Sequence, residues 1–202
     1  MTLTVWLSLV AICCLGAISP GPSLVVVLRH SLGNGRSHGI LTAISHGTGV
    51  AIWAVLTLWG LGLLVTETPL LYTALTYAGA GYLAWMGVKA LRAKQNSALQ
   101  VEGRSSSLAD AARDGIMISL LNPKLAIFFI ALFSQFVSAD QGTTEQLIMV
   151  ATVFSIDTLW YIIVALIISH PRVLRSLEKR ATTINRATGL VLIGLALRVV
   201  TL

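Results

Sequence analysis

Residues 39–66 read GILTAISHGTGVAIWAVLTLWGLGLLVT, a run without a single Lys, Arg, Asp or Glu. A helix needs roughly 20 mostly apolar residues to cross a bilayer, because each residue adds ~1.5 Å across a hydrocarbon core ~30 Å thick. Residues 39–66 are therefore predicted to form a membrane-spanning helix. Further runs of the same kind lie on both sides of it.

Five other runs have a similar apolar character. Two contain no charged residue, and three are each interrupted by one, namely Lys124, Asp157 or Arg198. The runs are long and continuous rather than alternating, which argues against a transmembrane β-barrel. The first run lacks the basic start of a cleaved signal peptide, so we interpret it as a permanent span. We predict an all-α integral membrane protein with six transmembrane helices, the other five being in residues 1–28, 68–88, 116–139, 146–169 and 188–202.

The composition and the placement of charge agree with this prediction. The chain is 55% hydrophobic and only 11% charged, whereas soluble domains carry about 25% charged residues. Of its 14 Lys and Arg residues, 12 fall in the loops after the first, third and fifth runs. Because positive charge marks cytoplasmic loops, both termini are predicted to lie on the outer side. This sorting explains the net charge of +6 without a nucleic-acid partner.

A polar segment divides the chain into two parts. Residues 94–115 are predicted to be a cytoplasmic linker, with a short helix from Leu108 that is capped by the preceding serines. Residues 1–93 and 116–202 would then be two three-helix halves. An odd number of spans in each half gives the halves opposite orientations, an architecture common among transporters.

The first helix of each half is predicted to be broken at proline. The first span contains Ser19-Pro20-Gly21-Pro22 and the fourth contains Asn122-Pro123-Lys124. Proline removes a backbone donor and glycine frees the chain, so a regular helix cannot continue there. Measured from the ends of the apolar runs, both breaks are predicted to lie toward the cytoplasmic ends of their spans. Paired breaks of this kind indicate a transporter binding site.

Four polar or aromatic residues in the spans are further site candidates. Asp157 is costly in the membrane, and burial disfavours its charged form, which makes it a candidate proton carrier. His46 could shuttle protons or simply join two helices by a hydrogen bond. Lys124 could extend to the cytoplasmic interface, pair with Asp157 or bind a substrate carboxylate. Trp160 is an interface anchor or a cavity wall.

Motifs for other chemistry are missing from the sequence. There is no Walker loop, no dinucleotide fingerprint and no Cys or His cluster with metal-ligand spacing. Cys13 and Cys14 are adjacent and are interpreted as small apolar filler. We therefore expect neither an enzyme nor a cofactor, and we expect coupling to an ion gradient rather than to ATP.

Several short motifs give the chain a recognisable pattern, and with them it resembles the LysE/RhtB family of amino-acid exporters over nearly its whole length. The resemblance implies six spans in the cytoplasmic (inner) membrane of a bacterium, with periplasmic termini. It also implies export of amino acids such as threonine, homoserine, leucine or lysine, driven by the proton-motive force. Ser23 and Ser134 depart from the family, which often has asparagine and proline there. The motifs are Pro20-Gly21-Pro22, Ser31-Leu32-Gly33-Asn34-Gly35-Arg36, Gly39, Gly79-Ala80-Gly81-Tyr82-Leu83, Gly115, Asn122-Pro123-Lys124 and Gln135-Phe136-Val137.

The resulting hypothesis is a secondary exporter of neutral amino acids. Its proton-coupling residues would be Asp157 and His46. Its partners would be the amino acid, protons and the lipid bilayer, and the glycine-rich faces permit a homo-oligomer. A metal-ion permease, an intramembrane enzyme using Ser19 or Ser45 with His46, and a structural subunit remain alternatives. The predicted substrate-binding residues are Pro20, Gly21, Pro22, Ser23, Asn122, Pro123, Lys124 and Trp160.

Overall fold

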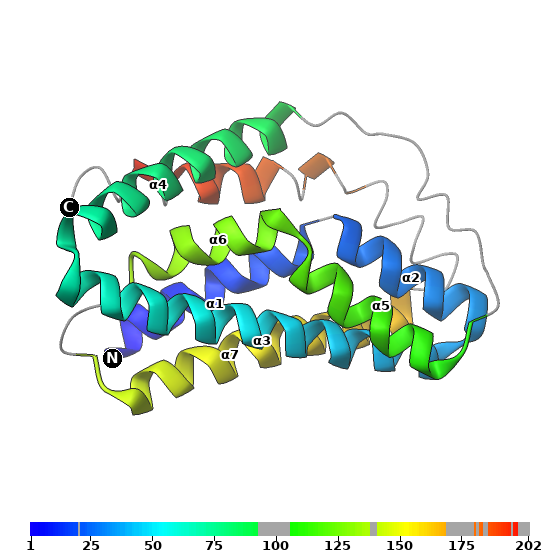
Figure 1. The fold of residues 1–202 in the computed structure, drawn as a ribbon. Helices are drawn as coiled ribbons and strands as arrows, with labels where there is room; N and C mark the ends of the chain where they lie inside the picture. Colours follow the sequence, from blue (N-terminus) through cyan, green and yellow to red (C-terminus); the bar gives the residue numbers. More distant parts are fainter. Residues whose placement is uncertain are drawn as a thin grey trace.

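The computed structural model describes residues 1–19, 21–92, 106–137, 141–168, 180, 182–183, 186–194 and 196–197. Over these residues the chain is a bundle of helices with no strand, which confirms the predicted all-α class (Figure 1). The elements in chain order are α1 (Leu3–Ile18), α2 (Pro22–Asn34), α3 (Arg36–Glu67), α4 (Pro69–Arg92), α5 (Leu108–Leu120), α6 (Pro123–Phe133), α7 (Thr143–Ile163) and the π-helix η1 (Val164–Ile168).

The helices provide between two and four candidate membrane spans. Residues in α3 (Arg36–Leu64) and in α7 with η1 (Thr143–Ile167) are long and apolar enough to cross a membrane alone. The α1–α2 and α5–α6 pairs meet the same criteria when each bent pair is taken as one span. Within the described residues, the predicted six spans are therefore confirmed only in part. The third predicted span, α4, has 24 residues but is less apolar, and the sixth lies partly outside the described residues.

Both predicted proline breaks are present. The axes of α1 and α2 differ by 60°, and those of α5 and α6 differ by 54°. Pro22 and Pro123 each stand in the first turn of the helix after the break, where a missing backbone donor costs nothing. Pro20 lies outside the described residues.

The breaks lie near the middle of each bent pair rather than toward one end. The flanking helices have 16 and 13 residues in the first pair and 13 and 11 in the second. The predicted positions were counted from the ends of the charge-free runs, whereas α2 continues past Arg29 to Asn34 and α5 begins at Leu108, before the run that starts at residue 116. The turn into α3 is made by Gly35 alone, whose φ of 91° suits glycine.

The start of α5 confirms the predicted serine cap. The Ser107 hydroxyl accepts a hydrogen bond from the Asp110 N–H at 3.1 Å, and the Asp110 carboxylate accepts one from the Ser107 N–H at 3.0 Å. This reciprocal pair satisfies two donors at the helix start. The helix then runs unbroken to Leu120, so residues 108–115 are continuous with the fourth predicted span.

The central helix is α3, which packs against α2, α5, α6 and α7. Glycines allow these helices to approach closely. A Cβ at Gly115 of α5 would collide with the Thr42 carbonyl oxygen, and one at Gly47 of α3 would collide with the Thr158 hydroxyl. These contacts fix the positions of α5 and α7 along α3, and thus set which polar residues face each other.

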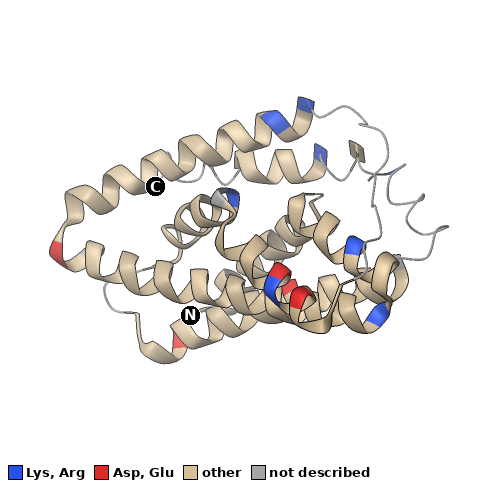
Figure 2. Cartoon of the chain, turned by 45° about the vertical axis from the view of Figure 1, so that its right-hand side comes forward, with Lys and Arg blue, Asp and Glu red and all other residues tan. Residues whose placement is uncertain are grey.

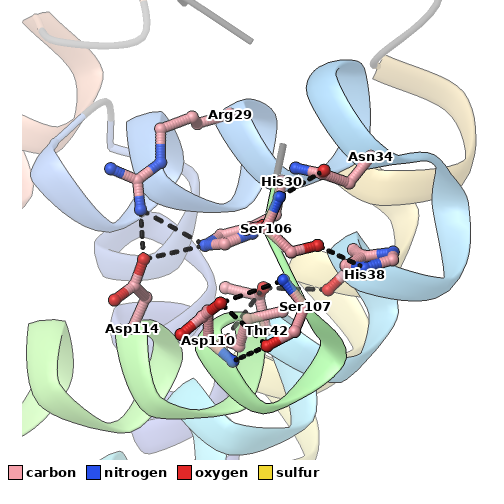
Figure 3. A network of polar contacts seen from close by, with 10 residues as sticks. Arg29, His30, Asn34, His38, Thr42, Ser106, Ser107, Asp110 and Asp114 are labelled. Carbon is pink, nitrogen blue, oxygen red and sulfur yellow. Dashed lines mark hydrogen bonds and ion pairs between the residues drawn. The ribbon is translucent and has the colours of Figure 1, made fainter. Parts of the chain in front are cut away.

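A polar cluster joins α2 to the start of α5 (Figure 3). Asp114 forms an ion pair with Arg29 and lies 2.9 Å from Nε2 of His30. His30 is 1% exposed, and its Nδ1 lies 3.1 Å from the Ser106 hydroxyl. The Asn34 side-chain oxygen accepts the Ser106 N–H at 2.8 Å. We call these five residues the α2–α5 cluster, because they connect α2, the second helix of the first bent pair, to the start of α5, the first helix of the second pair.

The surface distribution fits a bilayer environment. Exposed large apolar side chains cover the outer faces of α3, α4 and α7, including Leu56, Trp59, Leu70 and Leu159. Soluble monomers rarely expose apolar patches of that extent. Figure 2 shows charged residues mainly near the helix ends, with only acidic residues at its left end and most basic residues toward its right. This is the sorting of charge that the loops predicted.

Candidate functional site

A cavity lies where the two breaks meet, between α1, α2, α3, α6 and α7. Its volume is about 70 Å³, and one water needs ~10–15 Å³ on the same measure. The cavity therefore has room for several waters or part of a small solute. Seven of the predicted site residues line it, namely Gly21, Pro22, Ser23, His46, Asn122, Lys124 and Asp157. The predicted binding and proton residues are thus brought together.

Three side chains in the cavity wall form a hydrogen-bonded chain. Nδ1 of His46 lies 2.7 Å from a carboxylate oxygen of Asp157, and Nε2 lies 2.8 Å from the hydroxyl of Ser23. All three are buried, with His46 at 1% exposure. His46, Asp157 and Ser23 come from α3, α7 and α2. A proton added to one of these side chains therefore changes the hydrogen bonds between three helices.

Tyr161 and Thr158 complete the surroundings of the pair. The Tyr161 ring stands edge-on to His46, with the ring centroids 4.8 Å apart. Thr158 packs where Gly47 leaves room, next to His46 along α3. From the sequence, Tyr161 was an interface anchor or a cavity wall, like Trp160, and it does line the cavity; Thr158 had no predicted role. The signal was present in α7, because Asp157 and Tyr161 are four residues apart and so lie on one helix face.

The two helix starts at the breaks differ in capping. Asn122 accepts the Lys124 N–H through its side-chain oxygen at 3.1 Å, which caps α6. No side chain caps α2, whose start is Gly21 followed by Pro22. A helix N-terminus carries a partial positive charge and free donors. The start of α2 is therefore the end better suited to receive an anion from the cavity.

Lys124 also contributes positive charge to this part of the cavity. Its Nζ lies 3.8 Å from where a Cβ on Gly21 would stand, so the side chain reaches from α6 to the start of α2. Among the ion pairs of the described residues, none involves Lys124, and the predicted pair with Asp157 is not formed. The cavity thus holds one ammonium and, on another wall, one carboxylate already bonded to His46.

Two predicted substrate residues lie elsewhere or cannot be assigned. Trp160 does not line the cavity and packs instead against a small apolar cluster of α2, α3 and η1. Its buried indole nitrogen has no hydrogen-bond partner among the described residues. Pro123 starts α6, and its side chain lies outside the part of the chain that the structure describes.

The rest of the cavity wall is mostly apolar. Cys13, Gly16 and Phe128 belong to it, and a Cβ at Gly16 would stand 3.2 Å from the tip of the Phe128 ring. The apolar part could hold a small uncharged side chain. Within the described residues, no three His, Cys, Asp or Glu side chains form a group that could bind a metal ion.

Comparison with known proteins gives the same family as the sequence motifs. The family model described as LysE type translocator matches residues 14–202. The threonine efflux protein of Escherichia coli (strain K12) is 28% identical over 91% of each chain. The leucine efflux protein of Enterobacter sp. (strain 638) is 32% identical over 91% of this chain and 89% of its own. The membrane protein YrhP of Bacillus subtilis (strain 168) is 24% identical over 95% and 96%. No solved structure matches this chain. The resemblance indicated by the motifs is confirmed.

Proposed function

Because this chain belongs to the LysE type translocator family, we propose that it exports a neutral amino acid across the bacterial cytoplasmic membrane in exchange for protons. The observation that carries the proposal is the buried Asp157–His46–Ser23 chain in a cavity at two helix breaks. An ionisable group inside a membrane protein is a functional candidate by default. Here it faces a cavity with room for part of a small solute.

The substrate would bind as a zwitterion between the two charged walls. Its carboxylate would lie at the start of α2, near the Lys124 ammonium. Its ammonium would lie near Asp157, where it competes with a proton. The remaining wall is mostly apolar, and no other charged side chain is found among the described residues that line it. This arrangement favours an uncharged side chain, and relatives named for threonine and leucine efflux support that class.

Competition at Asp157 supplies the coupling. A site that binds either a proton or the substrate ammonium, and that changes sides when one is bound, moves the two in opposite directions. An inward proton gradient then drives the amino acid outward. The two breaks support this because irregular backbone at membrane depth is tolerated where it lines a cavity.

The wider topology belongs to the same proposal. We propose six spans, with both termini in the periplasm and two three-helix halves in opposite orientations. Support comes from the basic loops and from the matching breaks in the α1–α2 and α5–α6 pairs. Cysteines introduced singly at the α3–α4 turn and at Arg113, treated with an impermeant thiol reagent, test this topology. The turn should react from outside and Arg113 should not.

A second candidate function follows from the same three side chains. Ser23, His46 and Asp157 stand in the order of nucleophile, base and orienting carboxylate, as in serine hydrolases. Family membership favours transport. Labelling of wild type by a fluorophosphonate probe, absent in Ser23→Ala, would favour the hydrolase instead.

The direct test is efflux from proteoliposomes with an imposed pH gradient, using a panel of labelled amino acids. We expect gradient-driven movement of one or a few neutral amino acids. Asp157→Asn should lose the gradient response, whereas Asp110→Asn, at an exposed helix cap, should retain it. If Asp157→Asn remains coupled, the proton site is elsewhere. If no amino acid moves, the substrate class is wrong, and metal ions form the next panel.

A further inference from the structure

Ser23 connects the Asp157–His46 pair to the start of α2, at the break in the first bent pair. It is the second residue of α2, next to the break, and it lines the cavity. Its hydroxyl is bonded to Nε2 of His46 at 2.8 Å, and it is 6% exposed. A hydroxyl can donate one hydrogen bond and accept others. The direction of this bond is therefore set by whether Nε2 carries a hydrogen.

Without an added proton, the direction is fixed by Asp157. An ionised Asp157 accepts from Nδ1–H of His46, at 2.7 Å. Neutral imidazole carries one hydrogen, so Nε2 is then an acceptor. Ser23 must donate to it, which leaves the oxygen lone pairs of Ser23 available to accept from other donors.

One added proton reverses the bond wherever that proton resides. If His46 becomes imidazolium, Nε2 carries a hydrogen and donates to Ser23. If Asp157 becomes a carboxylic acid, it donates to Nδ1, and the imidazole hydrogen again lies on Nε2. In both cases Ser23 becomes the acceptor from His46, and its own hydrogen turns away from the ring.

We propose that Ser23 transmits the protonation state of the Asp157–His46 pair to the cavity by reversing this hydrogen bond, so that a solute ammonium binds only the unprotonated site. Unprotonated, the wall offers a carboxylate and a hydroxyl oxygen, which attract an ammonium. Protonated, it offers a neutral pair and a hydroxyl hydrogen, which reject one. This inference rests on the proposed export function and reassigns Ser23 from substrate binding alone to proton coupling.

Other titratable groups around the pair come from three further positions. Tyr161 of α7 contacts His46 directly, and Cys13 of α1 and Lys124 of α6 line the same cavity. None of these is within hydrogen-bond distance of His46 among the described contacts. The pH dependence of exchange should therefore follow the pair, and Asp157→Asn should flatten it.

The test is exchange of labelled against unlabelled threonine in proteoliposomes at equal pH on both sides, from pH 5.5 to 8. Exchange needs no net proton movement, so it reports binding competition. Wild-type exchange should fall as pH decreases. Ser23→Ala removes the acceptor of the Nε2–H bond in the protonated state. When the proton resides on His46 this bond is charge-assisted, and its loss costs more than that of the neutral bond in the unprotonated state. The midpoint should therefore move down by about half to one pH unit, roughly a three- to tenfold loss of proton affinity.

Two further variants separate this role from a structural one. Ser23→Thr keeps the hydroxyl and should restore the wild-type midpoint. Ser134→Ala removes a buried serine whose hydroxyl bonds only the Ala131 carbonyl, at 3.0 Å, and should leave the midpoint unchanged. Coincident profiles for wild type and Ser23→Ala would overturn the proposal.

An infrared titration keeps the proposal testable if transport itself is absent. The pH-dependent infrared band of the Asp157–His46 pair, either carboxyl or imidazolium, is assigned by its loss in Asp157→Asn and followed with pH in purified protein. If wild type exchanges no amino acid, the export function fails. A lower midpoint of this band in Ser23→Ala still supports the reversal, and an unchanged midpoint refutes it.

Discussion

Gly115 provides the sharpest test of the packing that builds the site. It is buried in α5 against the backbone of α3, where a Cβ would collide with the Thr42 carbonyl oxygen and stand 3.1 Å from Cβ of Ser45. Backbone cannot move aside as a flexible side chain can. Overpacking of this kind costs ~1–3 kcal/mol, and Gly115→Ala should destabilise the fold through it.

The comparison variant is Gly81→Ala in α4. A Cβ at Gly81 meets nothing within 4 Å. Both substitutions gain the same helix propensity, about 1 kcal/mol, so this gain cancels in their difference. What remains is the overpacking at Gly115. At ~2–4 °C per kcal/mol for a chain of this size, the Tm of Gly115→Ala should lie about 2–12 °C below that of Gly81→Ala.

The assay is thermal unfolding of the purified protein in one detergent, followed by tryptophan fluorescence and by loss of the monodisperse peak in size-exclusion chromatography. Wild type is measured beside both variants. Equal midpoints, or a higher one for Gly115→Ala, would refute the close contact of α3 with α5. The position of His46 relative to the breaks would then need to be reconsidered, since α3 carries both His46 and Thr42, the residue that Gly115 contacts.

Three further results are expected. Lys124→Gln should raise the KM for threonine exchange about tenfold, because hydrogen bonds to charged groups are worth ~1.5–3 kcal/mol, and an unchanged KM would mean that Lys124 extends out of the cavity. Asp114→Asn should lower Tm by several degrees relative to Asp110→Asn, since Arg29 and buried His30 lose their shared carboxylate at ~1–3 kcal/mol; equal Tm values would discount the α2–α5 cluster. Gly16→Ala narrows the cavity beside Phe128 and should reduce exchange of leucine more than that of alanine, whereas a uniform loss would contradict a role in size selection.

Much of the fold was accessible from the sequence, because apolar runs and prolines act locally. Each run of more than about 20 residues without charge became a helix, and each Pro motif became a break. The Ser107 cap was also predictable, since its partner Asp110 is three residues away. Helix ends were less accessible. α2 passes through Arg29 and His30 because their partners in α5 satisfy them, and no local pattern reports such long-range pairs.

The site was accessible only as a set of candidates. Sequence reasoning selected Asp157 and His46 because each is costly in a membrane, but left open whether His46 shuttles protons or joins helices. Their 2.7 Å contact depends on how α7 lies along α3, which the Gly47–Thr158 contact fixes. Trp160 was selected only as an aromatic residue in a span, and its side chain packs against the apolar cluster of α2, α3 and η1 instead.

The helices after the two breaks are capped unequally, and this difference bears on how the cavity would bind the proposed solute. Both α2 and α6 start with proline at membrane depth, where unsatisfied backbone donors are expensive. At α6 the Asn122 side chain supplies the missing acceptor. At α2 no side chain does, although Lys124 adds a second positive group there. An anion from the cavity would satisfy both, and a carboxylate has two oxygens to do so. The cost of leaving α2 uncapped is then recovered only when a solute is bound, which makes binding itself the event that stabilises one arrangement of the broken helices over the other.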